Sequence, residues 1–266
     1  MNNPSLYLGT SSWTAAGWES VFYPPQTREA DYLSFYATQF NAVEIDSTFY
    51  RIPSAQTVQR WRERTPDGFV FAAKVPQIIT HQKCLVDTES DLKAFLEVMD
   101  LLGPKLGPLL LQLPYFNKQK FDGLNSFLEV LEPCLRSLPK GYQWALEIRN
   151  KNWLCERFFA VLKTFGVAFT FIDHPWMPRP AEVFKRGDPV TANFAYVRWL
   201  GDRKDIEKKT LVWDRTYIDR NAELREWVQV LRQLQALGLP IYTFANNHYA
   251  GHAPETIRLF NQLWQE

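Results

Sequence analysis

The stretch AVEIDSTFY, residues 42–50, starts like a buried strand and then places two carboxylates, Glu44 and Asp46, among apolar neighbours. A carboxyl group in apolar surroundings has a raised pKa and can donate a proton, whereas one beside a cation stays ionised. Glu44 and Glu147 could therefore be the acid and the base of a glycoside hydrolase, with Arg149 or Arg198 keeping one of them ionised.

Three further side chains extend this chemistry. His81 is a candidate proton carrier because the unperturbed pKa of histidine is about 6.5, although a histidine that only caps a loop is an equal alternative. Asp173 is another candidate acid–base group. Lys74 could form a Schiff base if it is desolvated beside a second cation, and otherwise it would contact an anion or phosphate. The sequence contains no GxSxG motif that would indicate a serine nucleophile.

Metal ligands are few. The four histidines are His81, His174, His248 and His252. The last two have HxxxH spacing, but they lie in a turn-like stretch with Gly251, which does not favour a zinc site. We therefore assign no metal site and no cofactor, and a single Mg or Mn ion held by strand-end carboxylates stays an open alternative.

The elements that would position these groups are eight short apolar runs, each typical of a buried strand. They are residues 6–10, 42–45, 69–75, 107–113, 142–148, 167–172, 194–199 and 240–245. Segments with helical periodicity follow most of them, and the clearest begins with a capping-box pattern at Thr88 and Asp91 and ends at Gly103. Only the connection after the sixth run is irregular.

Alternating strands and helices with continuous apolar strands predict a parallel sheet covered by helices. Eight such units in 266 residues match a single-domain α/β protein, a TIM-type eight-stranded barrel over residues 1–266. An open doubly wound sheet is the alternative, but no GxGxxG or P-loop pattern follows a strand.

In such barrels the loops after the carboxyl ends of the strands build the active site. Every predicted strand here ends in polar groups, and aromatic rings that could stack on sugars or bases lie beside them. The expected substrate-binding residues are Trp13, Asp46, Thr48, Tyr50, Lys74, Gln112, Arg149, Trp153, Arg198, Asn246 and Asn247. A solvated barrel rim or a structural ion pair is the alternative for any one of them. The opposite strand ends, such as Gly107 and Pro240, carry no comparable set.

Composition sets the broad class. The 30 basic and 29 acidic residues give a net charge of +1, so no global field draws the chain to nucleic acid or to a membrane surface, although a local basic cleft is compatible with it. The three cysteines lack CxxC spacing and read as packed thiols. The amino terminus lacks a signal-peptide pattern, and no apolar stretch could span a membrane, so we expect a cytoplasmic protein.

Eight motifs in order along nearly the whole chain resemble the YecE-like family of microbial proteins, the domain of unknown function family seventy-two. They are GTSSW, YPP, VEIDSTFYRIPS, FAAKVPQIITH, LLLQLP, LEIRNKNW, YVRWLG and FANNHYAGHAPET. The resemblance implies a TIM barrel with no established activity. It points to Glu44, Thr48, Tyr50, Lys74, His81, Gln112, Glu147, Arg149, Asp173, Arg198 and Asn247 as the site. The sequence departs from the family pattern at three positions. Asp46 stands where the family more often has Asn, Ser12 where it usually has Gly, and Leu200 where it usually has His.

Two functions are consistent with these residues. The first is an enzyme that performs general acid–base chemistry, of hydrolase or isomerase type, on a sugar- or nucleotide-like and possibly phosphorylated small molecule. The second is a non-catalytic protein that grips the phosphates and bases of nucleic acid with the same cations and rings. The balanced net charge favours the enzyme.

Overall fold

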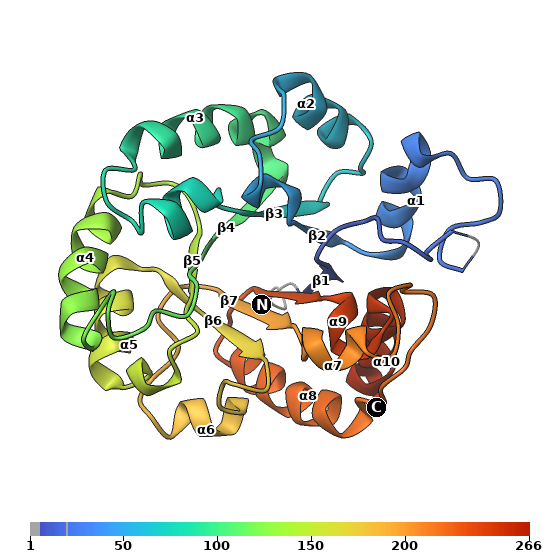
Figure 1. Cartoon of the computed structure of the whole chain (residues 1–266). Coiled ribbons are helices and arrows are strands. Elements are labelled where there is room, and N and C mark those ends of the chain that lie inside the picture. Colours follow the sequence, from blue (N-terminus) through green and yellow to red (C-terminus); the bar gives the residue numbers. More distant parts are fainter. Residues whose placement is uncertain (1–5, 20) are drawn as a thin grey trace.

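Eight parallel strands form a barrel, and the helices surround it, in the computed structural model, which describes residues 6–19 and 21–266 (Figure 1). The strands are β1 Leu6–Thr10, β2 Ala42–Ile45, β3 Val70–Lys74, β4 Leu106–Gln112, β5 Trp144–Glu147, β6 Ala168–Asp173, β7 Ala195–Trp199 and β8 Ile241–Ala245. Their hydrogen-bonded order is β1-β8-β7-β6-β5-β4-β3-β2. The expected α/β barrel is confirmed, and each predicted apolar run overlaps one strand.

Longer helices follow most strands. They are α1 Tyr32–Gln39, α2 Ala55–Glu63, α3 Glu89–Met99, α4 Leu124–Ser137, α5 Glu156–Phe165, α8 Asn221–Ala236 and α10 Ala253–Gln265. Three are short: α6 Pro180–Phe184, α7 Arg203–Glu207 and α9 Asn247–Ala250. The irregular sixth connection contains the five-residue α6. Two single turns also matter, the 3-10 turn η2 Ser47–Phe49 and the π-helical turn η3 Ile78–Gln82.

The predicted capping box at the start of α3 is wrong. Thr88 is the N-cap residue, but its side chain makes no capping hydrogen bond. The Asp91 carboxylate instead accepts a hydrogen bond of 2.7 Å from Lys83 Nζ. Gly103, with a φ of 57°, lies within a 3-10 segment that follows the end of α3 at Met99. The tertiary ion pair thus replaces the local cap.

Side chains join β1 to β2, which are the two ends of the hydrogen-bonded order. The Tyr36 hydroxyl donates to the Ala42 carbonyl oxygen at 3.1 Å and accepts from the Thr10 amide at 2.8 Å. The Asn41 side chain accepts from the Leu8 amide at 2.8 Å. A Cβ atom at Gly9 would overlap the Ala42 carbonyl, so glycine permits the close approach that closes the barrel.

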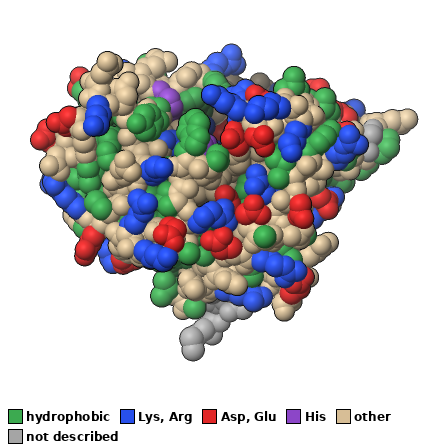
Figure 2. Space-filling model, turned by 60° about the horizontal axis from the view of Figure 1, so that its bottom comes forward, with side chains coloured by type: hydrophobic (Ala, Val, Ile, Leu, Met, Phe, Trp, Pro, Cys, Tyr) green, Lys and Arg blue, Asp and Glu red, His purple; other side chains and the backbone are tan. Residues whose placement is uncertain are grey.

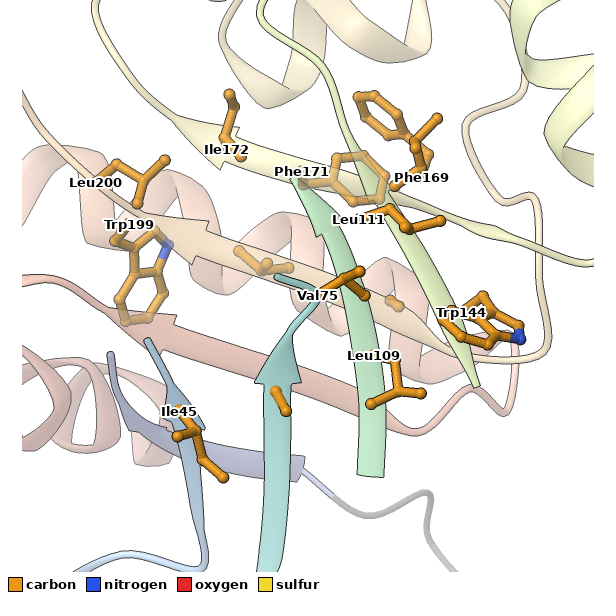
Figure 3. Packing of buried hydrophobic residues seen from close by; sticks show 14 of the residues in the cluster. Ile45, Val75, Leu109, Leu111, Trp144, Phe169, Phe171, Ile172, Trp199 and Leu200 are labelled. Carbon is orange, nitrogen blue, oxygen red and sulfur yellow. The ribbon is translucent and has the colours of Figure 1, made fainter. Parts of the chain in front are cut away.

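Two apolar layers fill the molecule. Outward-facing strand residues pack under the helices, and Figure 3 shows Leu111 of β4, Trp144 of β5 and Phe171 of β6 in this layer. The barrel interior holds a second cluster: Ala42, Val70, Ala72, Leu110, Ala145, Ala168, Phe194, Tyr196, Tyr242 and Phe244. Because side chains alternate between the two faces of a strand, the residue two positions after an inward one also points inward.

This alternation explains how charges enter the barrel. Glu44 follows Ala42 by two positions, Lys74 follows Ala72, Glu147 follows Ala145 and Arg198 follows Tyr196. Four strands therefore carry a charged group one layer above the apolar interior, toward their carboxyl ends. The fold brings together at one end of the barrel residues that are up to 154 positions apart in the chain.

Candidate functional site

Arg198 lies at the centre of a buried ion network. Its Nε and Nη2 atoms donate to Oε1 of Glu44 at 3.1 and 2.6 Å, and its Nη1 atom donates to Oε2 of Glu147 at 2.7 Å. The Arg198 side chain is 3% exposed and the two carboxylates are fully buried. The planar guanidinium therefore bridges two carboxylates from strands on different sides of the barrel.

The remaining oxygens of both glutamates are also bonded. The Tyr196 hydroxyl donates to Oε2 of Glu44 at 2.7 Å. Arg149 Nε donates to the Oε1 atom of Glu147 at 2.7 Å, and Arg149 Nη2 lies 2.6 Å from the same oxygen. Each carboxylate thus uses both oxygens within the protein, which offsets the cost of burying its charge.

These contacts set the protonation states. Burial raises the pKa of Glu147, but the guanidinium groups of Arg149 and Arg198 outweigh burial and lower that pKa to about 2. Burial also lowers the pKa of Arg198, yet Glu44 and Glu147 raise it well above its ordinary value. Burial and the Glu44 charge raise the pKa of Tyr196. At neutral pH Glu147 is therefore a carboxylate and Tyr196 a neutral phenol, so Glu147 is poorly suited to donate a proton.

Asp46 and Lys74 form the open side of the network. Lys74 Nζ lies 3.3 Å from Asp46 Oδ1 and 4.2 Å from the centre of the Phe49 ring. Arg198 Nη2 lies 3.6 Å from the same Asp46 oxygen. The Asp46 side chain is 31% exposed, yet its Oδ1 atom is buried and accepts no hydrogen bond from the described residues. This pair therefore retains hydrogen-bonding capacity next to solvent.

The charges in this group are balanced. We call the six residues the mouth cluster: Glu44, Asp46, Lys74, Glu147, Arg149 and Arg198. It contains three carboxylates and three cations. Its members range from fully buried glutamates to the Asp46 side chain, which is 31% exposed. The cluster has a fixed interior and a solvent-accessible edge.

Two histidines stand near this edge. The His81 Nδ1 atom lies 2.9 Å from the Thr80 hydroxyl oxygen, and its ring packs edge-on against Phe49 at 4.9 Å. Burial, with further contributions from Lys74 and Arg149, lowers the pKa of His81. Burial and Arg149 lower the pKa of His174 to about 4. Both imidazoles are therefore neutral at pH 7 and can accept a proton.

Asp173 and Thr48 make structural contacts instead of joining the cluster. Asp173 shares the outward face of β6 with Phe169 and Phe171 and accepts hydrogen bonds from Trp227 Nε1 at 2.7 Å and from the Tyr249 hydroxyl at 2.9 Å. Arg179 pairs with its other oxygen at 2.6 Å. The buried Thr48 hydroxyl lies 2.8 Å from the carbonyl oxygens of Ile45 and Lys74. It holds η2 against β2 and β3.

The two asparagines after β8 and one tryptophan also have structural partners. Asn246 caps α9 by accepting from the His248 amide at 3.0 Å. Asn247 Oδ1 accepts from Trp18 Nε1 at 3.3 Å and from the Ala253 amide at 2.9 Å. Trp153 is buried with stacking neighbours Phe127, at 4.6 Å, and Phe116, at 6.2 Å. These groups stabilise the connections that follow β8 and β5.

Three predicted residues remain at the rim. Trp13 is half-buried and packs edge-on against Trp61 at 5.3 Å. The side-chain amide of Gln112 donates to the Leu113 carbonyl oxygen at 2.7 Å, and Gln112 lies opposite Glu147 in the register of β4 and β5. The Tyr50 side chain is 74% exposed. Each of these three residues leaves part of its surface accessible to solvent.

Sequence reasoning missed two participants, Tyr196 and His174. Tyr196 stands two positions before Arg198, so the alternation of β7 already assigns both to the inward face. His174 directly follows β6. The sequence indicates His174 only as a possible metal ligand, because nothing in it shows that Arg149 lies nearby. The signal for Tyr196 was available, and that for His174 was not.

The backbone is strained where β1 ends. Ser12 has a φ of 128°, a conformation that side-chain-bearing residues rarely adopt. The neighbouring Ser11 hydroxyl oxygen is buried and has no hydrogen-bond partner among the described residues. Strained backbone and unpaired polar atoms persist where the surrounding structure enforces them, and they concentrate at binding sites.

The described residues, 6–19 and 21–266, contain neither a cluster of metal ligands nor a helix suited to span a membrane. No three His, Cys, Asp or Glu side chains in this part of the chain come together as a metal site would require. Within the same residues, no helix combines the length and apolar character needed to cross a membrane.

The fold and the position of the mouth cluster define an eight-stranded β/α barrel with an ionic site at the carboxyl ends of its strands. The chain belongs to the family described as protein of unknown function DUF72, whose model matches residues 7–266. It is similar to the UPF0759 protein YecE of Escherichia coli K12, with 27% identity over 98% of this chain and 92% of that protein. It is also similar to the UPF0759 protein YunF of Bacillus subtilis 168, with 27% identity over 94% of this chain and 91% of that protein.

The crystal structure of a DUF72 family protein from Thermotoga maritima supports the same fold. It superimposes with a TM-score of 0.77 at 25% identity and covers 98% of this chain and 100% of that chain. A DUF72 structure from Enterococcus faecalis has a TM-score of 0.70 at 21% identity, covering 98% and 96%. The predicted family and barrel are therefore confirmed.

Proposed function

We propose that the protein is an enzyme that performs general acid–base chemistry, of hydrolase or isomerase type, on a small sugar- or nucleotide-like substrate that carries an anionic group. The observation that carries this proposal is the Asp46–Lys74 pair. Its carboxylate and ammonium groups face each other at 3.3 Å, and Asp46 Oδ1 accepts no hydrogen bond from the described residues. An acceptor and a donor with spare capacity beside a fully bonded network are suited to a ligand.

The exposed edge supplies the binding groups. Lys74 and Arg149 would hold the anionic group, because their side chains reach solvent at 10% and 19% exposure. Asp46 and His81 would transfer protons. The Asp46 side chain is 31% exposed and its Oδ1 atom accepts no hydrogen bond from the described residues. The lowered pKa of His81 keeps that imidazole neutral and able to accept a proton at pH 7.

The buried glutamates take a different role from the one expected of an acid–base pair. Glu44 and Glu147 hold Arg198 from both sides, and Glu147 also holds Arg149. Charges and dipoles fixed in this way need little reorganisation during a reaction, which is how enzymes stabilise developing charge. The two glutamates would therefore position cations for the substrate, and the proton-transfer role moves to the cluster's edge.

A nucleic-acid-binding role is less well supported. A phosphate backbone entering the mouth would meet three carboxylates as well as three cations. On the face drawn in Figure 2, acidic and basic side chains are interspersed, which matches the net charge of +1. A balanced field gives little of the attraction that non-specific nucleic-acid binding requires.

The test is turnover by the whole protein. Wild-type protein is incubated with separate sugar phosphates, uronic acids and nucleoside phosphates in D2O, and NMR records cleavage, isomerisation or deuterium incorporation. Asp46→Asn should keep ligand binding, or tighten it by removing a negative charge, and should lower turnover by about a hundredfold or more. Lys74→Met should weaken binding.

A matched control is Lys93→Met, because Lys93 forms an exposed pair with Glu97 on α3 and should have no effect on either measurement. Undiminished turnover in Asp46→Asn would contradict the proposed role of Asp46. Binding of nucleic acid that weakens steeply with salt, without turnover of any compound, would favour the non-catalytic alternative.

A further inference from the structure

Large apolar side chains on the surface gather at one end of the barrel. Eight are exposed in the described part of the chain, and seven of these lie in connections that follow the carboxyl end of a strand. Only Leu237, between α8 and β8, lies at the opposite end. Exposed apolar groups that concentrate at one end of a molecule are a feature of interaction surfaces.

Three of the seven side chains are aromatic. Tyr50 follows β2, Tyr115 follows β4 and Trp176 follows β6, so the rings come from alternate strands around the mouth. Their exposed fractions are 74%, 64% and 60%. We call them the rim rings. Aromatic rings with a polar handle suit ligands that offer an apolar face and hydrogen-bonding edges.

Two of the rim rings pack against residues that contact or adjoin the candidate site. Tyr50 packs edge-on against Phe49 at 5.1 Å, and the face of Phe49 lies 4.2 Å from Lys74 Nζ. Trp176 packs edge-on against His174 at 5.2 Å, the imidazole whose pKa Arg149 helps to lower. A ligand held by the mouth cluster could therefore extend over these rings without leaving the protein surface.

The chemistry of the surface favours one kind of extended ligand. Sugar rings present C–H faces that stack on aromatic side chains, and their hydroxyl groups both donate and accept hydrogen bonds. Such hydroxyls match the mixed acceptors and donors of Asp46, Lys74 and Gln112. A polynucleotide would instead bring one phosphate per residue toward a cluster with three carboxylates.

We propose, resting on the proposed function above, that the substrate is the end of a glycan chain rather than a free monosaccharide or nucleotide. The mouth cluster takes the terminal sugar, with its anionic group on Lys74 and Arg149. The rim rings stack on the sugars that follow. The proposal thus assigns Tyr50, Tyr115 and Trp176 a binding role toward an oligosaccharide.

The experiment measures binding by calorimetry and by NMR shifts of the tryptophan indole groups, and it follows turnover of the same probes by NMR. The probes are gluco- and xylo-oligosaccharides from mono- to hexasaccharide, neutral and with a terminal uronic acid, and single-stranded oligonucleotides of the same lengths. Affinity for the acidic oligosaccharides should rise with length until the rim is filled. Each of Tyr50→Ala, Tyr115→Ala and Trp176→Ala should weaken the longer ligands about fivefold and leave the monosaccharide unchanged.

Leu237→Ala is the matched control, because it removes an exposed apolar side chain from the other end of the barrel and should change nothing. Length-dependent binding without turnover would support this inference and contradict the acid–base proposal. Turnover of a monosaccharide or a nucleotide, without any gain in affinity from chain length, would support the acid–base proposal and contradict this inference. Length-dependent binding of oligonucleotides but not of oligosaccharides would overturn the glycan assignment.

Discussion

Replacing Arg198 by methionine tests the ion network most severely. In the structure Glu147 would keep Arg149 as a partner, whereas Glu44 would keep only the Tyr196 hydroxyl at 2.7 Å. The variant therefore leaves about one buried carboxylate without a compensating cation. Breaking a buried ion pair in this way costs about 3–5 kcal/mol of unfolding free energy. For a chain of this size the expected fall in Tm is about 6–10 °C.

Urea unfolding followed by tryptophan fluorescence and far-ultraviolet circular dichroism measures this loss. Adding Glu44→Gln to Arg198→Met should recover a large part of it, because the double variant no longer buries the unpaired charge. Arg225→Met is the control. Arg225 and Glu266 form an exposed pair at 2.6 Å, whose loss should cost less than about 1 kcal/mol.

The reasoning would be refuted by two results. The first is a loss below about 1 kcal/mol in Arg198→Met, which would mean that the network contributes no more than a surface pair. The second is a double variant that is no more stable than the single one. Either result would show that Arg198 does not neutralise Glu44 in the folded protein.

Three further predictions concern the strand ends. Ser12→Gly should raise the unfolding free energy by about 1 kcal/mol in urea titrations, since glycine relieves the strain of a φ of 128°. A lower unfolding free energy in this variant would contradict the strain assigned to Ser12. Gly9→Ala should lose at least about 3 kcal/mol or fail to fold, because the new Cβ overlaps the Ala42 carbonyl; near-normal stability would disprove the closure described. His174 should titrate near pH 4 by NMR and, in Arg149→Met, at higher pH; titration near 6.5 in the wild type would contradict the assigned environment.

The lowered pKa of His174 also determines the direction in which the stability of the protein changes with pH. Its pKa in the folded protein, about 4, lies below the ordinary value of histidine. The unfolded chain therefore binds more protons between these two values. The contribution of His174 to stability is fully present above about pH 6.5 and is lost as the pH falls toward 4. His174→Gln should flatten unfolding stability across this range, and an unchanged pH profile would argue against it.

Much of the fold could be predicted from the sequence because strand patterning is local. Runs such as residues 107–113 are apolar except for Gln112 near the end, as parallel strands covered on both faces require. The helix ends were less accurate. Thr88 does not form the predicted capping box because Lys83 binds Asp91 instead. A contact from outside the helix decided that detail.

The site could be predicted only in part, because a strand end does not reveal the direction of a side chain. Glu44 and Arg198 point into the barrel, as their positions two residues after inward neighbours require. Asp173 also ends a strand, but it shares the face of Phe171 and points outward to Trp227. Counting the alternation along β6 would have separated Asp173 from the others.

Aromatic residues show a second limit of the sequence. Trp153 and Trp176 both follow strand ends, yet the first is buried between other rings and the second is 60% exposed. The difference comes from neighbours such as Phe127 on α4, which are distant in sequence. Burial of a loop side chain depends on how connections pack together, and no local pattern predicts it.

A crystal structure of the protein soaked with oligosaccharides that carry a terminal uronic acid tests the central claim most directly. We expect ligand density above the carboxyl ends of the strands, with the acidic group at Lys74 and Arg149 and a hydroxyl at the Asp46 carboxylate. Well-occupied ligand bound only elsewhere on the surface, with Asp46 and Lys74 contacting nothing but each other, would contradict it.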